Sequence, residues 1–146
     1  MQLTVHTDYA LRVLMYLSIQ PDKIVTIDEI TDFYEISRNH LVKVVHNLSS
    51  KGFISTSRGK HGGMQLSRPP TEISIGEVVR RMEANFDIVE CFSEDSKKCR
   101  VLPICNLKSV LQQASESFLS YLDQYSLADA VQSNNHLTKL ISRLSS

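Results

Sequence analysis

Apolar residues recur with helical spacing through the first fifty positions of the chain. Apolar side chains at i, i+3, i+4 and i+7 give a helix one buried face. Three stretches follow this pattern or one close to it, with apolar residues at Ala10, Val13, Leu14 and Leu17, at Ile27, Ile30, Phe33 and Tyr34, and at Leu41, Val44, Val45 and Leu48. The pattern predicts three short helices that pack on one another.

Capping residues indicate where these helices begin and end. Thr7 is expected to cap the first helix, with Asp8 in its first turn and Pro21 beyond its end. Thr26 and Glu29 have the spacing of a capping box, which opens the second helix. The third helix is expected to have a polar cap before it and a left-handed glycine after it, Ser37 and Gly52.

The spacing of apolar residues is no longer helical after Gly52. Residues 53–58 and 64–68 read as two strands, and the segment between them, 59–63, holds three glycines and two basic side chains. This arrangement predicts a β-hairpin with a tight, cationic tip. Two short helices joined by a tight turn and followed by such a hairpin are typical of a winged helix-turn-helix DNA-binding domain.

The second half of the chain predicts a loop and a long helix. Ser74 and Glu77 are spaced as another capping box, and the helix that they open has four apolar residues facing inward, Ile75, Val78, Val79 and Met82. Residues 84–104 show no clear periodicity. A long helix is expected from Cys105, and its apolar residues form a heptad seam, Leu107, Leu111, Ala114, Phe118, Tyr121 and Tyr125.

This seam is wider than one small domain needs, so we expect it to pack against the same helix of a second subunit. The alternative is packing within one chain. Shorter helical segments are expected after Ser126 and near the carboxyl end of the chain.

Composition limits the classes of protein that fit. The chain has 146 residues, of which 42% are hydrophobic, so it can form one domain with an appended arm. No run of about 18 apolar residues occurs, and no charged leader precedes an apolar stretch, so we expect neither a membrane span nor a secretion signal. A cytoplasmic location is expected, where thiols stay reduced.

The net charge of zero hides a cationic block. Residues 37–68 contain no acidic side chain and six basic ones, Arg38, Lys43, Lys51, Arg58, Lys60 and Arg68. Such a block on a neutral chain is the electrostatic footprint expected of a phosphate-binding surface. An ordinary solvated surface is the alternative, but the block coincides with the predicted helix-turn-helix and wing.

The residues expected to contact double-stranded DNA follow from this placement. The start of the third helix offers polar side chains that can reach bases or phosphates in the major groove, Ser37, Arg38, Asn39, His40 and Lys43. The tip of the hairpin offers cations for phosphates or the minor groove, Arg58, Lys60 and His61.

Three cysteines, the only ones in the chain, lie within fifteen residues: Cys91, Cys99 and Cys105. An odd number of thiols fits a metal centre that takes its fourth ligand from elsewhere, and an iron–sulfur cluster fits the count best. Zinc sites usually use closely spaced cysteine pairs, which are absent here. A disulfide switch, a zinc site and inert cysteines therefore remain open beside the cluster. Lys97, Lys98 and Arg100 are available to offset the charge of an anionic cluster.

Several motifs together give the chain a family resemblance. Residues 2–12, 37–43, 58–63, 117–119 and 127–129, with Pro103 and the three cysteines, make the sequence similar to the NsrR family of repressors. This is a branch of the winged-helix regulators that also contains the iron–sulfur regulator IscR. The resemblance covers nearly the whole chain.

The resemblance implies a cluster-gated repressor. It implies a homodimer in which the three cysteines of one subunit hold each cluster, and nitric oxide as the effector that attacks the cluster and releases operator DNA. It also implies that Asp8 is a cluster ligand, from its own or the partner subunit; the alternative is an ordinary first-turn helix carboxylate. A 4Fe–4S cluster is favoured over 2Fe–2S by three thiolates and a carboxylate.

Two departures from the family pattern stand out. Seven residues separate Cys91 from Cys99, more than is usual in the family. The IscR branch uses a histidine three residues after the last cysteine, where this chain has Lys108.

The sequence thus predicts a mostly α-helical protein with three parts. Residues 1–82 are expected to form the winged helix-turn-helix domain, 83–105 the cluster-binding loop, and 106–146 the dimerisation helix and carboxyl-terminal helices. The predicted function is a transcriptional repressor that senses nitric oxide, and not an enzyme. The alternatives are a regulator of iron–sulfur or redox status with the same fold, and an electron-transfer protein, which would need neither the cationic block nor the wing.

Overall fold

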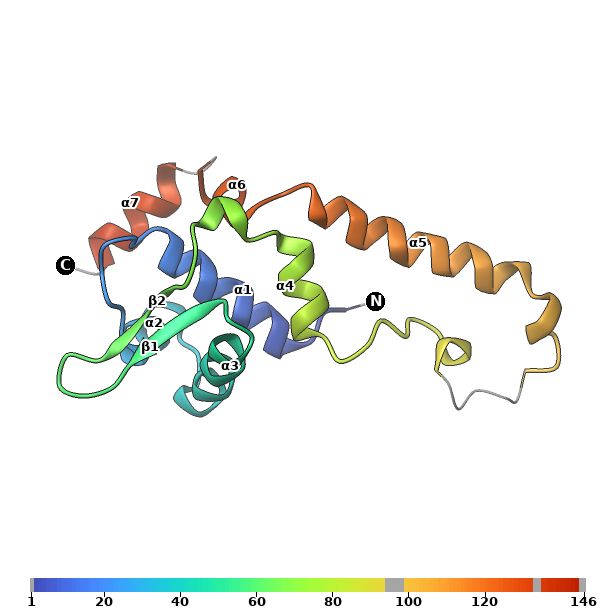
Figure 1. Ribbon diagram of the computed structural model, residues 1–146, viewed down its shortest axis with the longest axis horizontal. Coiled ribbons are helices and arrows are strands. Elements are labelled where there is room, and N and C mark those ends of the chain that lie inside the picture. The colour runs from blue at the N-terminus through green and yellow to red at the C-terminus, as the bar shows by residue number, and fades with distance from the viewer. Residues whose placement is uncertain (1, 94–98, 133–134, 145–146) are drawn as a thin grey trace.

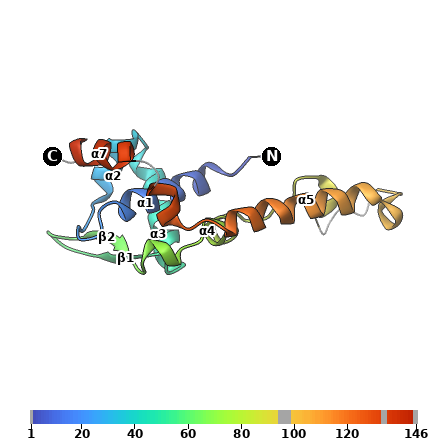
Figure 2. The same ribbon diagram turned by 90° about the horizontal axis from the view of Figure 1, so that it is seen from above.

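A computed structural model describes residues 2–93, 99–132 and 135–144. In chain order its elements are α1 (Val5–Ser18), α2 (Ile27–Tyr34), α3 (Arg38–Ser50), β1 (Ile54–Ser57), β2 (Gly63–Leu66), the 3-10 turn η1 (Pro70–Glu72), α4 (Ile75–Met82), the 3-10 turns η2 (Glu90–Phe92) and η3 (Leu102–Ile104), α5 (Asn106–Asp123), α6 (Leu127–Gln132) and α7 (Asn135–Leu144). Figure 1 shows a body made from all of these except η2, η3 and α5. Helix α5 projects from the body as an arm, which Figure 2 shows from above.

Helix α1 begins earlier than the sequence predicted. Its cap is Thr4, whose side-chain oxygen accepts a hydrogen bond from the Thr7 backbone nitrogen over 3.3 Å. Thr7 is instead fully buried in the first turn, so the prediction that it caps the helix was wrong. The prediction that Asp8 lies in the first turn is confirmed.

Helices α2 and α3 form the predicted helix-turn-helix. The capping box of Thr26 and Glu29 is complete, and Glu35 ends α2 in the left-handed conformation, with φ of 53°. Ser37 stands at the cap of α3, but its side chain makes no capping hydrogen bond. Gly52, with φ of +76°, follows α3 as predicted. The predicted inward face of α3 is confirmed, because its four apolar residues are buried.

The wing is an antiparallel hairpin. Strand β1 pairs with β2 so that Ile54 lies opposite Leu66 and Ser57 lies opposite Gly63. A further bridge from Val25 to Met64 ties the hairpin to the segment before α2. A Cβ at Gly63 would lie 2.6 Å from the Val25 carbonyl oxygen, so only glycine permits this close approach.

Helix α4 joins the body to the arm. Ser74 caps it by accepting a hydrogen bond from the Glu77 backbone nitrogen, which is half of the predicted capping box. The Glu77 carboxylate makes its hydrogen bonds with Arg68 instead, because that guanidinium lies within 2.7 Å of both of its oxygens. At the other side of α4, Arg80 pairs with Asp123 at the end of α5.

The core lies in the body. Buried side chains from α1, α2, α3, the wing, α4, α6 and α7 meet there, together with Ile73, which follows η1. The largest fully buried ones are Tyr16, Phe53, Leu14, Leu17, Ile30, Leu41, Leu48, Ile73, Leu127 and Ile141. Helix α5 contributes only Ser115 and Leu119 as buried residues. The arm is therefore held to the rest of the chain along one narrow face.

Candidate nucleic-acid interface and cysteine loop

The outer face of α3 carries the side chains predicted to contact DNA. Its buried face, which includes Leu41 and Val44, points into the core, so the residues opposite are turned outward. The predicted contact residues are all exposed: Ser37, Arg38, Asn39, His40 and Lys43. Their side chains lie on the first two turns of the helix, where a recognition helix presents polar groups to base edges.

Arg38 already has a partner in the free protein. Its Nε lies 2.8 Å from a carboxylate oxygen of Asp28 on α2. Both side chains are more than 60% exposed, and an ion pair in such a setting contributes little free energy. A phosphate or a guanine edge can therefore replace Asp28 at small cost.

The wing extends the same surface. A groove of about 540 Å³ lies between α3 and the hairpin, with Val42, His46 and Lys60 among its lining residues. The predicted wing cations are all exposed, Arg58, Lys60 and His61. Of the predicted DNA contacts, Arg38 of α3 and Lys60 of the wing line this groove.

Arg68 is separated from the rest of the cationic block. It is half-buried, pairs with Glu77, and donates a hydrogen bond to the Glu72 carbonyl oxygen over 3.0 Å. Its guanidinium also lies 5.7 Å from the centre of the Phe53 ring. The contacts show that Arg68 links the wing to α4, a role that the charge pattern alone did not reveal.

The three cysteines lie along the loop and the start of the arm. Cys91 is in η2, Cys99 precedes η3, and Cys105 is the cap residue of α5. All three are free thiols; Cys99 is exposed and the other two are partly buried. Lys97 and Lys98, predicted to offset cluster charge, lie outside the described residues.

The described residues do not gather the cysteines into a closed site. Within residues 2–93, 99–132 and 135–144, no three histidine, cysteine or acidic side chains are close enough to hold one metal ion. The donor set still fits an iron–sulfur cluster by its chemistry, because three free thiols on one segment can all become thiolate ligands.

Asp8 stands apart from these thiols. It lies in the body on α1, whereas η3 and Cys105 lie at the outer end of the arm (Figure 1). Its carboxylate is 2.8 Å from Arg12 Nη2, one helical turn along. A single chain in this conformation does not bring Asp8 to the cysteines.

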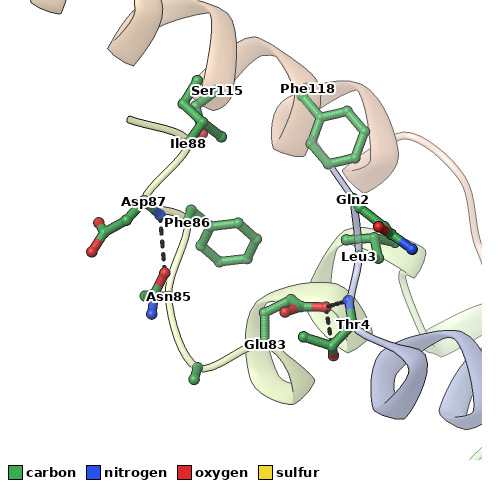
Figure 3. A pocket seen from close by; sticks show the side chains of 11 residues that line it. Gln2, Leu3, Thr4, Glu83, Asn85, Phe86, Asp87, Ile88, Ser115 and Phe118 are labelled. Carbon is green, nitrogen blue, oxygen red and sulfur yellow. Dashed lines mark hydrogen bonds between the residues drawn. The ribbon is translucent and has the colours of Figure 1, made fainter. Parts of the chain in front are cut away.

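A small cavity separates α1 from the start of the cysteine loop. It has a volume of about 320 Å³, and Figure 3 shows Leu3, Phe86 and Phe118 around it. At its rim the Glu83 carboxylate accepts hydrogen bonds from the Thr4 backbone nitrogen, over 2.7 Å, and from the Thr4 hydroxyl, over 3.0 Å. The residue that caps α1 is thus fixed to the residue that ends α4.

The sequence reasoning missed this contact between Thr4 and Glu83. The two residues are 79 positions apart, and no periodic pattern links them. It also missed the pairing of Asn47 with His6, whose nitrogens lie 2.9 Å apart. For the pair of Asn47 and His6, the only hint in the sequence was that Asn47 is a polar residue of α3 beside the predicted contact face.

Within the described residues, no helix is both long enough and apolar enough to cross a membrane.

Comparison with known proteins gives consistent relatives. The sequence pattern of the Rrf2 family, described as an iron-dependent transcriptional regulator, matches residues 3–145. The chain is 45% identical over 143 residues to the HTH-type transcriptional regulator NsrR of Bacillus licheniformis, covering 97% of this chain and 100% of the relative. It is 44% identical to the NsrR of Bacillus subtilis over 142 residues, covering 97% of each chain.

Solved structures share the fold. CymR, the global cysteine regulator of B. subtilis, superposes with a TM-score of 0.74 at 18% identity and covers 92% of this chain and 99% of its own. IscR of T. potens superposes with a TM-score of 0.75 at 21% identity, covering 94% and 90%. These superpositions confirm the predicted fold class, a mostly helical winged helix-turn-helix protein with a long arm helix.

Proposed function

The chain belongs to the Rrf2 family of iron-dependent transcriptional regulators, and from this premise we propose that it is a homodimeric repressor that releases operator DNA in response to nitric oxide. It is a transcriptional regulator, as the sequence predicted, and not an enzyme. The proposal is carried by one observation: a chain 45% identical to regulators named NsrR has its only three cysteines as free thiols on one loop and arm.

The proposed DNA contacts lie on the exposed face of α3 and on the wing, with Arg38 and Lys60 lining the groove between the two. Asn39 and Lys43 extend from α3 toward the bases, while Arg58, Lys60 and His61 extend from the wing toward the backbone. Exposure of all five supports this assignment. Because Arg38 is held only by the exposed carboxylate of Asp28, it is available to a guanine edge or a phosphate.

The proposed cluster ligands are Cys91, Cys99, Cys105 and the partner subunit's Asp8. When bound, an iron–sulfur cluster supplies the group with which nitric oxide reacts. Cys105 stands at the amino end of the 18-residue helix α5, where the helix dipole favours negative charge, so thiolate ligation is supported there. A 4Fe–4S cluster suits three thiolates and one carboxylate better than a 2Fe–2S cluster does.

The arrangement of the arm supports ligation across a dimer. Asp8 does not lie with the cysteines in one chain, so a shared site requires that the arm of one subunit extend to the body of its partner. Apolar residues of α5 that the body leaves uncovered are available for this contact, with Leu107 65% and Val110 60% exposed.

A regulator of iron–sulfur or redox status is the second candidate. Its IscR form is disfavoured, because Lys108 stands where that branch has a histidine ligand. The two candidates differ in the signal rather than in the DNA-binding surface. Only the first requires that nitric oxide, with no change in iron supply, abolish binding.

An anaerobic gel shift tests the proposal. The cluster-loaded protein is mixed with a palindromic AT-rich duplex, and binding is followed before and after stoichiometric nitric oxide, with the cluster absorbance recorded in parallel. We expect loss of binding together with bleaching. Binding that survives the bleaching would make the cluster a structural part or a sensor of another signal.

Cysteine variants provide the matched controls. Cys91→Ser, Cys99→Ser and Cys105→Ser should each lose the cluster absorbance and the response to nitric oxide. Ser93→Ala changes a hydroxyl beside η2 and should keep both.

A further inference from the structure

The flank of α3 that faces α1 carries a cluster of polar side chains, of which only His40 belongs to the predicted contact set. The Asn47 side-chain nitrogen lies 2.9 Å from His6 Nε2, and the rings of Tyr9 and His40 lie 6.4 Å apart. His6 and Tyr9 come from the first two turns of α1. The opposite flank of α3, which holds Arg38, faces the wing groove instead.

A hollow of about 310 Å³ lies between α1 and α3 at this flank, lined by Val5, His6, Tyr9, His40, Lys43 and Val44. Two of these residues, His40 and Lys43, also belong to the proposed DNA-binding face. The hollow is therefore continuous with that face.

We propose that this hollow receives a phosphate group of the DNA backbone, with His6 and Tyr9 as contact residues and Asn47 as a positioning residue. The inference rests on the proposed function, because it assumes that α3 enters the major groove. That groove is about 12 Å wide and has a phosphate backbone along each side. The wing and its groove lie beside one backbone, so the α1 flank of α3 faces the other.

The hydrogen bonding of His6 suits this role. An amide nitrogen can only donate, so Asn47 donates to His6 Nε2, and the neutral ring then carries its proton on Nδ1. That leaves the ring a donor for a phosphate oxygen. The Tyr9 hydroxyl and the Lys43 ammonium group supply further donors from both helices.

The charge balance at the hollow also favours an anion. The acidic residue in the first turn of α1 is Asp8, and its charge is compensated by Arg12 at 2.8 Å. Residues 37–68, which include all of α3, contain no acidic side chain. The apolar part of the lining, Val5 and Val44, can pack against a deoxyribose ring.

Two unrelated duplexes, one AT-rich and one GC-rich, test the inference by fluorescence anisotropy with the full-length protein. A phosphate contact carries no sequence information, so His6→Ala and Tyr9→Phe should weaken both duplexes by the same factor. We expect about fivefold for each variant, the size of one hydrogen bond. The control is His136→Ala, which removes an imidazole from α7 and should bind both duplexes as the wild type does.

Two further variants separate positioning from folding. His6→Gln keeps a side chain with hydrogen-bond donors and should recover most of the lost affinity. His6→Ala combined with Asn47→Ala should cost no more than His6→Ala alone, since Asn47 acts through His6. An additive loss would give Asn47 a merely structural role and overturn that part of the inference.

The failures of the two proposals are distinguishable. If His6→Ala and Tyr9→Phe bind both duplexes like the wild type while Lys43→Ala weakens them, the inference is wrong and the DNA-binding face stands. If Lys43→Ala and Asn39→Ala have no effect, the face itself is wrong. If the α1 variants weaken the dimer in sedimentation and leave DNA affinity per dimer unchanged, the hollow is a subunit contact and the inference is again wrong.

Discussion

Asp8 pairs with Arg12 in the structure and is also a proposed cluster ligand. The small energy of the ion pair means that an Asp8 variant mainly tests the proposed ligand role. Its ion pair with Arg12 is an exposed i,i+4 pair, worth about 0.3–0.5 kcal/mol, so removing the carboxylate leaves α1 folded. As a proposed cluster ligand it is a hard oxygen among soft thiolates, and its bond should be the weakest of the four. The carboxylate is thus the proposed link between the cluster and the DNA-binding domain.

For Asp8→Ala we predict that the cluster still assembles on three cysteines, while nitric oxide releases DNA less completely or the starting affinity falls. Cluster absorbance and an anaerobic gel shift measure the two effects separately. Asp22→Ala, an exposed acid in the turn after α1, is the control. If the variant binds DNA with the wild-type affinity and releases it at the same dose of nitric oxide, Asp8 plays no part in the switch.

Glu29 gives the fold a pH-dependent contribution to stability. Burial raises the pKa of its carboxyl, but hydrogen bonds from Lys23 and Thr26 outweigh burial and hold the pKa below its ordinary value of 4.5. A pKa that is lower in the folded state means that the stabilisation is present above the unfolded value. It is lost as the pH falls through the folded value.

We therefore predict that Glu29→Gln, which keeps an acceptor for the Thr26 backbone but loses the charge paired with Lys23, lowers the free energy of unfolding by about 0.5 kcal/mol at pH 7. The difference from wild type should persist down to pH 4.5 and close below it. Urea unfolding of both proteins at pH 7, 5 and 3.5 measures this. A difference that stays constant to pH 3.5 would assign the loss to packing rather than to charge.

Contacts between individual residues were predictable where both partners lie within one turn of helix. The box of Thr26 and Glu29 formed as its spacing predicted. The spacing of Ser74 and Glu77 was equally good, yet the Glu77 carboxylate pairs with Arg68, whose Nη2 donates to both of its oxygens. Such charged hydrogen bonds are stronger than a bond to one backbone nitrogen. Thr4, and not Thr7, caps α1, and the Thr4 hydroxyl also donates a hydrogen bond to the Glu83 carboxylate, which is distant in the sequence.

At the scale of elements, the wing separates two cations that the sequence grouped together. Lys60 is exposed at the hairpin tip, whereas Arg68 is fixed to Glu77 at the base of the hairpin. Only a cation free to meet phosphate releases counterions when DNA binds. Substitution of Lys60 should therefore affect DNA binding, and substitution of Arg68 should affect the stability of the fold.

We predict that Lys60→Ala weakens binding to any duplex and reduces the slope of log affinity against log salt by about one. Arg68→Ala should leave that slope unchanged and lower the free energy of unfolding by roughly 1–3 kcal/mol, since it removes charged hydrogen bonds from a half-buried site. Anisotropy titrations between about 50 and 200 mM salt, together with urea unfolding, measure both. If Arg68→Ala also reduced the slope, Arg68 would reach DNA and its pairing with Glu77 would not persist in the complex.

The order of the elements followed from periodicity, but their connections did not. The helices, the hairpin and the long arm all lie where the spacing of apolar residues predicted them. In contrast, the segment with the cysteines has no periodicity, and only two short 3-10 turns are described there, η2 and η3. Apolar spacing indicates a packed face, and the described parts of this segment, 84–93 and 99–104, contain no buried residue.

At the scale of the whole molecule, the apolar stripe of α5 has one edge that the body covers and one that it leaves exposed. One edge, with Ser115 and Leu119, is buried against the chain's own body. The other edge, with Leu107, Val110 and Tyr121, is 58–65% exposed. The heptad spacing predicted a stripe wider than one domain needs, but it did not show which edge the body covers.

The same division explains why the proposed cluster site could not be assembled from one chain. Helix α1, which carries Asp8, lies in the body, whereas the start of α5, which Cys105 caps, lies at the far end of the arm (Figure 1). Sequence spacing shows which side chains share a helix face, but it does not show which subunit supplies a ligand. The site and the exposed edge of α5 therefore depend on one assembly.

The exposed edge of α5 provides the test of that assembly. Leu107→Asp and Val110→Asp each place a carboxylate where a dimer would bury an apolar side chain, so we predict that the dimer dissociation constant rises at least about a hundredfold, roughly 3 kcal/mol. Sedimentation measures it. Gln113→Asp adds the same charge at an exposed polar position of α5 and should leave the dimer intact. Because DNA half-sites are read in pairs, the monomeric variants should also lose operator binding while keeping a folded body. A dimer that survives both substitutions would place the subunit contact elsewhere and leave the partner's Asp8 without a route to the cysteines.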